Sequence, residues 1–149
     1  MAPQTFELFI DGASHGNPGP AGIGVVVRDG DGDYLLKRGE FIGKATNNVA
    51  EYTALIRGLE YLDTLLERQP REPGALEVRV FSDSQLIVRQ VTGEYKIKNT
   101  GLQPLAIRAQ KLMRKFPNLL IASVPREENA LADNLAGKAV VARETVDEA

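Results

Sequence analysis

The sequence contains no cysteine, no tryptophan and a single histidine, His15. Without cysteine there are no disulfide cross-links and no thiol nucleophile, and one histidine excludes the usual zinc and haem ligand sets. A catalytic site of the serine–histidine–aspartate type would have to use His15. The chemistry of this chain therefore has to depend mainly on its carboxylates.

The chain also lacks a strong net charge and any long apolar run. Its 18 lysines and arginines against 20 aspartates and glutamates give a net charge of −2, so only a local basic patch would attract nucleic acid. No apolar run approaches the ~18 residues of a membrane span, and the first ten residues do not have the pattern of a signal peptide. We therefore expect a cytoplasmic protein with no membrane partner.

What the chain does contain is the composition of a folded domain. It has 149 residues, of which 43% are hydrophobic and 26% charged, close to the average for globular proteins. No internal repeat, low-complexity segment or linker interrupts it. We predict a single domain over residues 1–149, monomeric, with a disordered acidic tail over residues 144–149.

The hydrophobic pattern predicts elements in the order βββαβααβα. Residues 6–11 are apolar on both faces, which is typical of a central strand, and apolar residues recur at helical spacing from Tyr52 to Leu66. The expected strands are 6–11, 22–28, 34–41, 76–82 and 118–124, and the expected helices are 48–68, 84–91, 101–116 and 130–143. Three meandering strands followed by strand–helix alternation indicate an α/β fold, a mixed five-stranded sheet with helices on both faces.

Two acidic residues follow strands that should be neighbours in this sheet. Asp11 ends the strand 6–11, and Asp83 follows the strand 76–82. A crossover connection makes these strands parallel, so both carboxylates should lie at one edge, where open α/β sheets bind ligands. Each acid also has a structural alternative: Asp11 as a turn residue, and Asp83 as part of a helical capping box.

Two further acids lie on predicted helices. Asn48-x-x-Glu51 can be a helical capping box, but Glu51 also precedes Leu55 by four residues. Its carboxylate therefore begins the apolar stripe and points inward, where no basic residue of the stripe can pair with it. Asp133 has small or polar neighbours at helical spacing, which leaves space for an ion or a phosphodiester; an exposed helical acid is the alternative. Four acids at one rim would require divalent cations, and oxygen-only ligands favour Mg²⁺ or Mn²⁺ over Zn²⁺.

The motifs around these acids resemble those of the type 1 ribonucleases H, over about residues 6–142. The motifs are Asp11-Gly12-Ala13-Ser14, Gly16-Asn17-Pro18-Gly19-Pro20, Thr46-Asn47-Asn48-x-Ala50-Glu51, Ser82-Asp83-Ser84-Gln85 and Asn129-x-x-Ala132-Asp133-x-Leu135-Ala136. The resemblance implies a ribonuclease H-like fold and an endonuclease that hydrolyses the RNA strand of RNA/DNA hybrids, leaving 5′-phosphate and 3′-hydroxyl ends. It also implies two Mg²⁺ ions, replaceable by Mn²⁺, held by Asp11, Glu51, Asp83 and Asp133.

The same resemblance implies which residues contact the hybrid. Amide side chains suit hydrogen bonds to groove edges and to the 2′-hydroxyls that separate RNA from DNA, although turn and cap roles are the alternative for them. The expected substrate contacts are Gly12, Asn17, Asn47, Asn48, Ser84, Gln85, Lys98, Arg126 and Asn129.

Two departures from the family pattern indicate a branch similar to the archaeal enzymes. The loop at residues 124–128 lacks the histidine that many relatives carry, so Arg126 or a glutamate would take its place, since His15 does not match that position. The short segment 93–99 stands where some relatives insert a basic, tryptophan-rich helix. There Tyr95, Lys96 and Lys98 would contact the DNA backbone, and a solvated loop is the alternative for them. Weaker and more salt-sensitive binding of the hybrid is the expected consequence.

Other functions stay open from the sequence alone. A broader nuclease would also cut double-stranded RNA, because duplex RNA and hybrid share an A-form shape. A non-catalytic hybrid-binding module is the second alternative, against which the four acids argue, since binding alone does not need a cluster that repels phosphate. A three-carboxylate exonuclease is disfavoured because Gly12 and Ala13, rather than a glutamate two residues on, follow Asp11.

Overall fold

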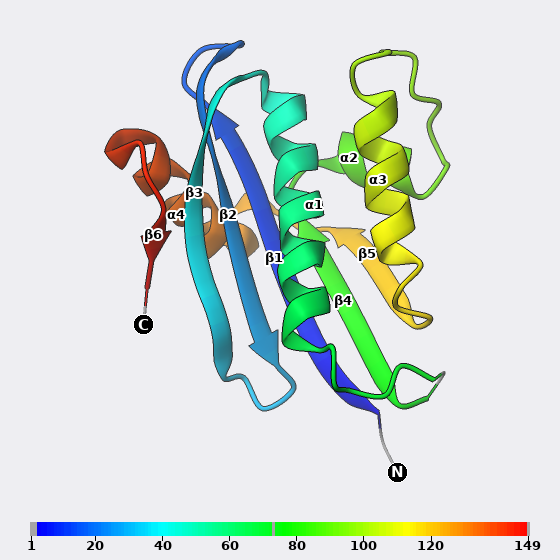
Figure 1. The fold of residues 1–149 in the computed structure, drawn as a ribbon. Coiled ribbons are helices and arrows are strands. Elements are labelled where there is room, and N and C mark those ends of the chain that lie inside the picture. The colour runs from blue at the N-terminus through cyan, green and yellow to red at the C-terminus, as the bar shows by residue number, and fades with distance from the viewer. Residues whose placement is uncertain (1–2, 73, 149) are drawn as a thin grey trace.

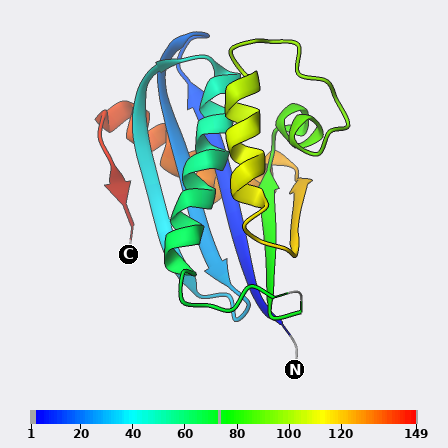
Figure 2. The same cartoon turned by 45° about the vertical axis from the view of Figure 1, so that its right-hand side comes forward.

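The computed structural model describes residues 3–72 and 74–148. Its mixed sheet has the strand order β5-β4-β1-β2-β3-β6, and helices cover both faces (Figures 1 and 2). The strands are β1 (Gln4–Ser14), β2 (Gly19–Asp29), β3 (Tyr34–Ala45), β4 (Leu76–Ser82), β5 (Leu119–Ser123) and β6 (Val146–Asp147). The helices are α1 (Asn47–Leu65), α2 (Gln85–Val91), α3 (Gln103–Met113) and α4 (Ala130–Ala142), with a 3₁₀ turn, η1 (Arg126–Asn129), before α4.

All the predicted elements are present in the predicted order, and the α/β fold class is confirmed. β1 lies between β4 and β2, parallel to the first and antiparallel to the second, as its two apolar faces indicated. In the β1–β4 register Phe9 is opposite Phe81. Asp11 and Asp83 therefore lie at equivalent positions, each two residues further on, at the same edge of the sheet.

The sheet has six strands rather than the predicted five, because the acidic tail forms β6 against the edge strand β3. Its acidic side chains find basic partners, Asp147 with Arg38 and Glu148 with Lys138. The predicted disorder is wrong for the part of the tail that the structure describes; Ala149 lies outside it. The acidic composition of the tail predicted that it would be solvated. In the structure, basic residues of β3 and α4, which are distant in the sequence, pair with its acidic side chains.

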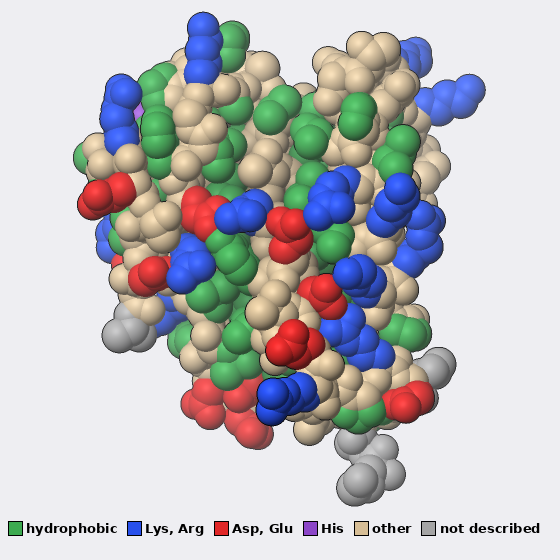
Figure 3. Space-filling model, viewed as in Figure 1, with side chains coloured by type: hydrophobic (Ala, Val, Ile, Leu, Met, Phe, Trp, Pro, Cys, Tyr) green, Lys and Arg blue, Asp and Glu red, His purple; other side chains and the backbone are tan. Residues whose placement is uncertain are grey.

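Helices α1 and α3 cover one face of the sheet, and α4 covers the other across β1, β2 and β3. The predicted stripe of α1 is buried in the main core, and the ion pairs Arg108–Glu60 (2.9 Å) and Lys115–Asp63 (3.0 Å) link α1 to α3 and the segment after it. Figure 3 shows acidic and basic side chains interspersed over this face. Within residues 3–72 and 74–148, no helix is both long and apolar enough to cross a membrane.

The end of β1 is in direct contact with the start of α1 at Gly12. A Cβ added to Gly12 would lie 2.3 Å from the carbonyl carbon of Ala50 and 2.5 Å from the backbone nitrogen of Glu51. Only glycine allows this approach, because the neighbouring atoms belong to backbone that cannot rotate away. The contact sets the position of Glu51 relative to Asp11, the residue before Gly12.

Candidate active site

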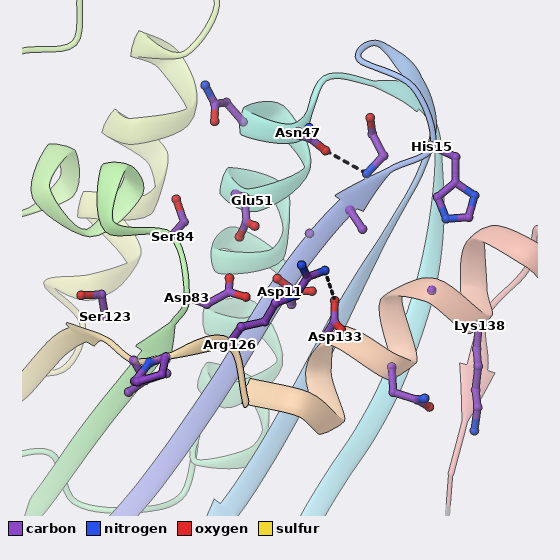
Figure 4. A pocket seen from close by; sticks show the side chains of 18 of the residues that line it. Asp11, His15, Asn47, Glu51, Asp83, Ser84, Ser123, Arg126, Asp133 and Lys138 are labelled. Carbon is purple, nitrogen blue, oxygen red and sulfur yellow. Dashed lines mark hydrogen bonds and ion pairs between the residues drawn. The ribbon is translucent and has the colours of Figure 1, made fainter. Parts of the chain in front are cut away.

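Three carboxylates meet where β1 and β4 end (Figure 4). Asp11 lies near the end of β1, Glu51 lies in the second turn of α1, and Asp83 lies between β4 and α2. One carboxylate oxygen of each residue lies within 4.8 Å of the others. The structure thus brings together three of the four acids that the sequence placed at one rim.

The alternative capping role of Asp83 is not what the structure shows. The N-cap of α2 is Ser84, whose hydroxyl accepts a hydrogen bond from the backbone nitrogen of Ile87 at 3.3 Å. Asp83 precedes this cap and lies outside the first turn of the helix. Likewise Thr46 caps α1 by accepting from Val49, so Glu51 has no capping role and its carboxylate is directed to the cluster.

The fourth acid, Asp133, lies in the first turn of α4 beside this group. Its negative charge contributes to raising the pKa of Asp11 and of Glu51. It forms an ion pair with Arg126 of η1, whose Nη2 lies 3.5 Å from Asp133 Oδ1. In Figure 4 the Arg126 side chain extends across the acids toward Asp133, and it is 76% exposed.

Burial makes the negative charges of the cluster costly. Asp11 is only 3% exposed, and burial, followed by the charges of Glu51 and Asp83, raises its pKa to about 10. Burial, with the charge of Asp83, raises the pKa of Glu51 to about 8. Among the described residues, nothing donates a hydrogen bond to the buried Glu51 Oε2. A divalent cation would supply this missing partner, and carboxylate oxygens are the ligands that such cations prefer.

These raised pKa values predict that the metal-free chain loses stability as the pH rises. Above about pH 4 the unfolded chain releases its carboxyl protons, whereas the folded chain retains those of Asp11 and Glu51. Because the folded state then binds more protons, the free energy of unfolding should fall with pH, by up to about 1.4 kcal/mol per pH unit for each retained proton. The fall should continue until Glu51 and then Asp11 ionise, near their pKa values of about 8 and about 10.

Denaturant unfolding between pH 5 and pH 9 in the presence of a chelator measures this fall. Asp11→Asn should make the curve flatter and raise the stability at high pH, and Mg²⁺ should stabilise the wild-type chain most at high pH. The control is Asp31→Asn, an exposed position in the turn between β2 and β3. A free energy of unfolding that stays constant or rises over this range would contradict the argument.

The acids lie in a groove of about 1510 Å³. It runs from the start of α2 and the end of β5, past the acids, and along α4. Six of the nine predicted substrate contacts line it, from the end of β1, the start of α1, the start of α2 and η1. They are Gly12, Asn47, Asn48, Ser84, Gln85 and Arg126.

Two predicted asparagines join the β1–β2 turn to the start of α1. The side-chain oxygen of Asn17 accepts a hydrogen bond from the backbone nitrogen of Asn47 at 3.0 Å. The side-chain oxygen of Asn47 accepts one from the backbone nitrogen of Ser14 at 3.1 Å. The side-chain oxygens of Asn17 and Asn47 therefore have the structural role that the sequence left open as an alternative. Their amide nitrogens are the atoms that a ligand would contact.

The three predicted contacts that do not line the groove are Asn17 in the β1–β2 turn, Asn129 and Lys98. Asn129 is 1% exposed, and its Nδ2 donates to the carbonyl oxygen of Ile10 at 2.8 Å. This bond ties the start of α4 to the residue before Asp11, so a direct contact with substrate would require Asn129 to leave its buried position. Lys98 is exposed in the connection between α2 and α3, which has no helix of its own.

Sequence reasoning missed the part of the groove that α4 forms beyond Asp133. Its lining residues include Asn134, Gly137, Lys138 and Val141. Helical spacing was the available signal, because Gly137 follows Asp133 by four residues and Lys138 follows Asn134 by four.

Known proteins similar to this chain agree with the geometry. The family model described as reverse transcriptase-like matches residues 9–139. Ribonuclease HI of Halobacterium salinarum is 40% identical over 134 residues, which cover 90% of this chain and 63% of that protein. The bifunctional protein Rv2228c of Mycobacterium tuberculosis is 44% identical over 134 residues, 89% of this chain and 35% of that protein. The chain thus spans less than two thirds of the length of these relatives.

Among solved structures, LC11-RNase H1 in complex with an RNA/DNA hybrid superposes with a TM-score of 0.83 at 41% identity, covering 94% of this chain and 98% of that one. The match to the family model, over residues 9–139, includes all four acids. This chain belongs to the type 1 ribonuclease H family.

Proposed function

We propose that this protein is an endonuclease that hydrolyses the RNA strand of RNA/DNA hybrids, leaving 5′-phosphate and 3′-hydroxyl ends. The observation that carries the proposal is the group of three carboxylates within 4.8 Å, with an unpartnered buried oxygen on Glu51. Such a site is costly without a cation, so a chain that only bound hybrids would gain nothing from it. Membership of the ribonuclease H family, with a relative solved in complex with an RNA/DNA hybrid, supports the choice of substrate.

We propose that Asp11, Glu51, Asp83 and Asp133 hold two Mg²⁺ ions, which Mn²⁺ can replace. When bound, such a pair of ions activates water and stabilises the attacking and leaving oxygens at phosphorus. The chain's own part is to hold the four carboxyl groups in place around the cations. Gly12 allows α1 to bring Glu51 close to Asp11, and the buried Asn129 ties α4, with Asp133, to β1.

Arg126 takes the place of the missing loop histidine in this proposal. It comes from the loop before Asp133, and the charges of Asp133, Asp11 and Asp83 raise the pKa of its guanidinium, so it is always charged. A guanidinium is a strong donor to phosphate oxygens. An arriving phosphate can therefore exchange for Asp133 as the partner of Arg126.

Recognition of RNA is assigned to donors on the α1 and α2 side of the groove. Asn47 and Asn48 at the start of α1, and Ser84 and Gln85 at the start of α2, line the groove beside the acids. Their amide and hydroxyl groups suit 2′-hydroxyls, while Lys98, outside the groove, would contact the DNA backbone. A single ribonuclease H domain, a monomeric state and a cytoplasmic location stay predictions.

The test is cleavage of an end-labelled RNA strand that is paired with DNA, paired with RNA or single-stranded, each with Mg²⁺, Mn²⁺ or a chelator. We expect internal cuts only in the hybrid and only with metal, because the acids need cations and the donors need 2′-hydroxyls. Cuts in duplex RNA as well would favour the broader nuclease. Binding of the hybrid without cleavage by any metal would leave a binding module and overturn the proposed activity.

A further inference from the structure

The groove continues beyond the acids along α4, on the side that carries none of the substrate contacts discussed so far. This α4 arm is lined by Asn134, Gly137, Lys138 and Val141, with His15 from the β1–β2 turn. Figure 4 shows α4 leading from Asp133 to Lys138, with His15 of the β1–β2 turn above α4 in this view. A polymer whose reacting group lies at the acids would extend directly into this arm.

Gly137 lies inside α4, where glycine destabilises a helix relative to alanine. Glycines of the sheet under α4 have a packing reason: a Cβ added to Gly24 would lie 1.9 Å from the carbonyl oxygen of Ala132. A Cβ added to Gly137 would meet no described atom within 4 Å. Packing therefore does not require this glycine, and the missing side chain leaves the arm open to the close approach of a ligand backbone.

Lys138 supplies the positive charge of the arm, and its present partner is a carboxylate. Its Nζ donates a hydrogen bond to Glu148 Oε1 at 2.7 Å, and in Figure 4 the side chain points away from the acids. Glu148 follows β6 and is held to β3 by a backbone hydrogen bond to Lys37. The lysine side chain is 52% exposed, and ion pairs at such positions contribute little to stability. A phosphate can therefore replace Glu148 at low cost.

We propose that the α4 arm binds the sugar–phosphate backbone of the strand being cut, with Lys138 leaving Glu148 to contact a phosphate beyond the scissile one. The inference rests on the proposed function and extends its binding site. Lys138 lies five residues along α4 from Asp133, about 7.5 Å along the helix axis, and successive phosphates of one strand advance about 3.4 Å along a duplex. The contacted phosphate is therefore about two nucleotides from the cut, and Glu148 competes with it.

The experiment measures KM and kcat for hybrid cleavage over a range of salt concentrations. Lys138→Gln should raise KM about three- to tenfold, leave kcat nearly unchanged and reduce the slope of log KM against log salt by about 1, as loss of one phosphate contact does. Glu148→Gln should lower KM, because it removes the competitor of the phosphate. The matched control is Lys111→Gln on α3, outside the groove lining, which should change neither value.

Gly137 gives an independent measurement of the same arm. Gly137→Gln should raise KM because its side chain fills the arm, although it replaces glycine by a better helix former. Wild-type KM and salt slope in Lys138→Gln, or unchanged KM in Glu148→Gln, would overturn the inference while leaving the proposed function intact. A wild-type chain that neither binds nor cuts hybrids would overturn both.

Discussion

Asp11→Asn should reduce kcat/KM for hybrid cleavage about a thousandfold or more, while the Kd for the hybrid changes little. Asparagine has nearly the same shape, so the fold and the groove are kept, but one negative ligand charge is lost from the centre of the cluster. A thousandfold loss corresponds to about 4 kcal/mol of transition-state stabilisation, which is reasonable when cations neutralise the developing charge. Steady-state kinetics and hybrid binding, measured side by side, provide the test.

The control for this prediction is the exposed Asp31→Asn, which removes the same charge far from the groove and should leave kcat/KM unchanged. Binding and catalysis separate in Asp11→Asn because the donors of α1 and α2 do not depend on the acid. Turnover within about tenfold of wild type would mean that Asp11 does not hold an essential cation. It would also remove the main support for a two-metal site.

Gly12→Ala should destabilise the protein by about 3 kcal/mol and lower kcat about a hundredfold in the fraction that stays folded. The added methyl group would lie 2.3–2.5 Å from backbone atoms of Ala50 and Glu51, so α1 has to move away from β1. Overpacking of this kind costs about 1–3 kcal/mol or more, and a catalytic group misplaced by about 1 Å loses about two orders of magnitude in rate. Thermal unfolding should show a Tm lower by about 10 °C.

Gly137→Ala is the matched control, because its methyl group would meet no described atom within 4 Å. We expect this variant to be slightly more stable than wild type, by about 0.5–1 kcal/mol, since alanine is the better helix former. If Gly12→Ala kept both the Tm and the kcat of wild type, the start of α1 would not be held by its contact with β1. The position of Glu51 close to Asp11 would then need another explanation.

Hydrophobic periodicity predicted the elements well because each strand and helix shows its buried face within a few residues. The apolar stripe of α1 and the two apolar faces of β1 are examples. The element bounds were less accurate: β1 begins two residues earlier than expected and ends three residues later, at Ser14. Pairing with β2 continues to Ser14, and a single strand carries no signal for the length of its partner.

The convergence of Asp11, Glu51 and Asp83 could be predicted for a topological reason. Parallel neighbouring strands end at one edge, and an acid that begins an apolar helical stripe has to point inward. The burial of Asn129 could not be predicted, because its partner is the carbonyl oxygen of Ile10, 119 residues away along the chain. An asparagine beside a helix start shows the same local pattern whether its partner is a substrate or a distant backbone group.

The sequence by itself determined the order of the elements, the edge at which the acids collect and the family to which the motifs belong, because periodicity, topology and short motifs are local properties. Only the tertiary structure decided that the acidic tail pairs with β3, that Arg126 lies against Asp133 and that Lys138 is held by Glu148. These contacts depend on which charges the fold brings within a few ångströms of one another. Opposite charges come from distant elements, so no local pattern specifies their pairing.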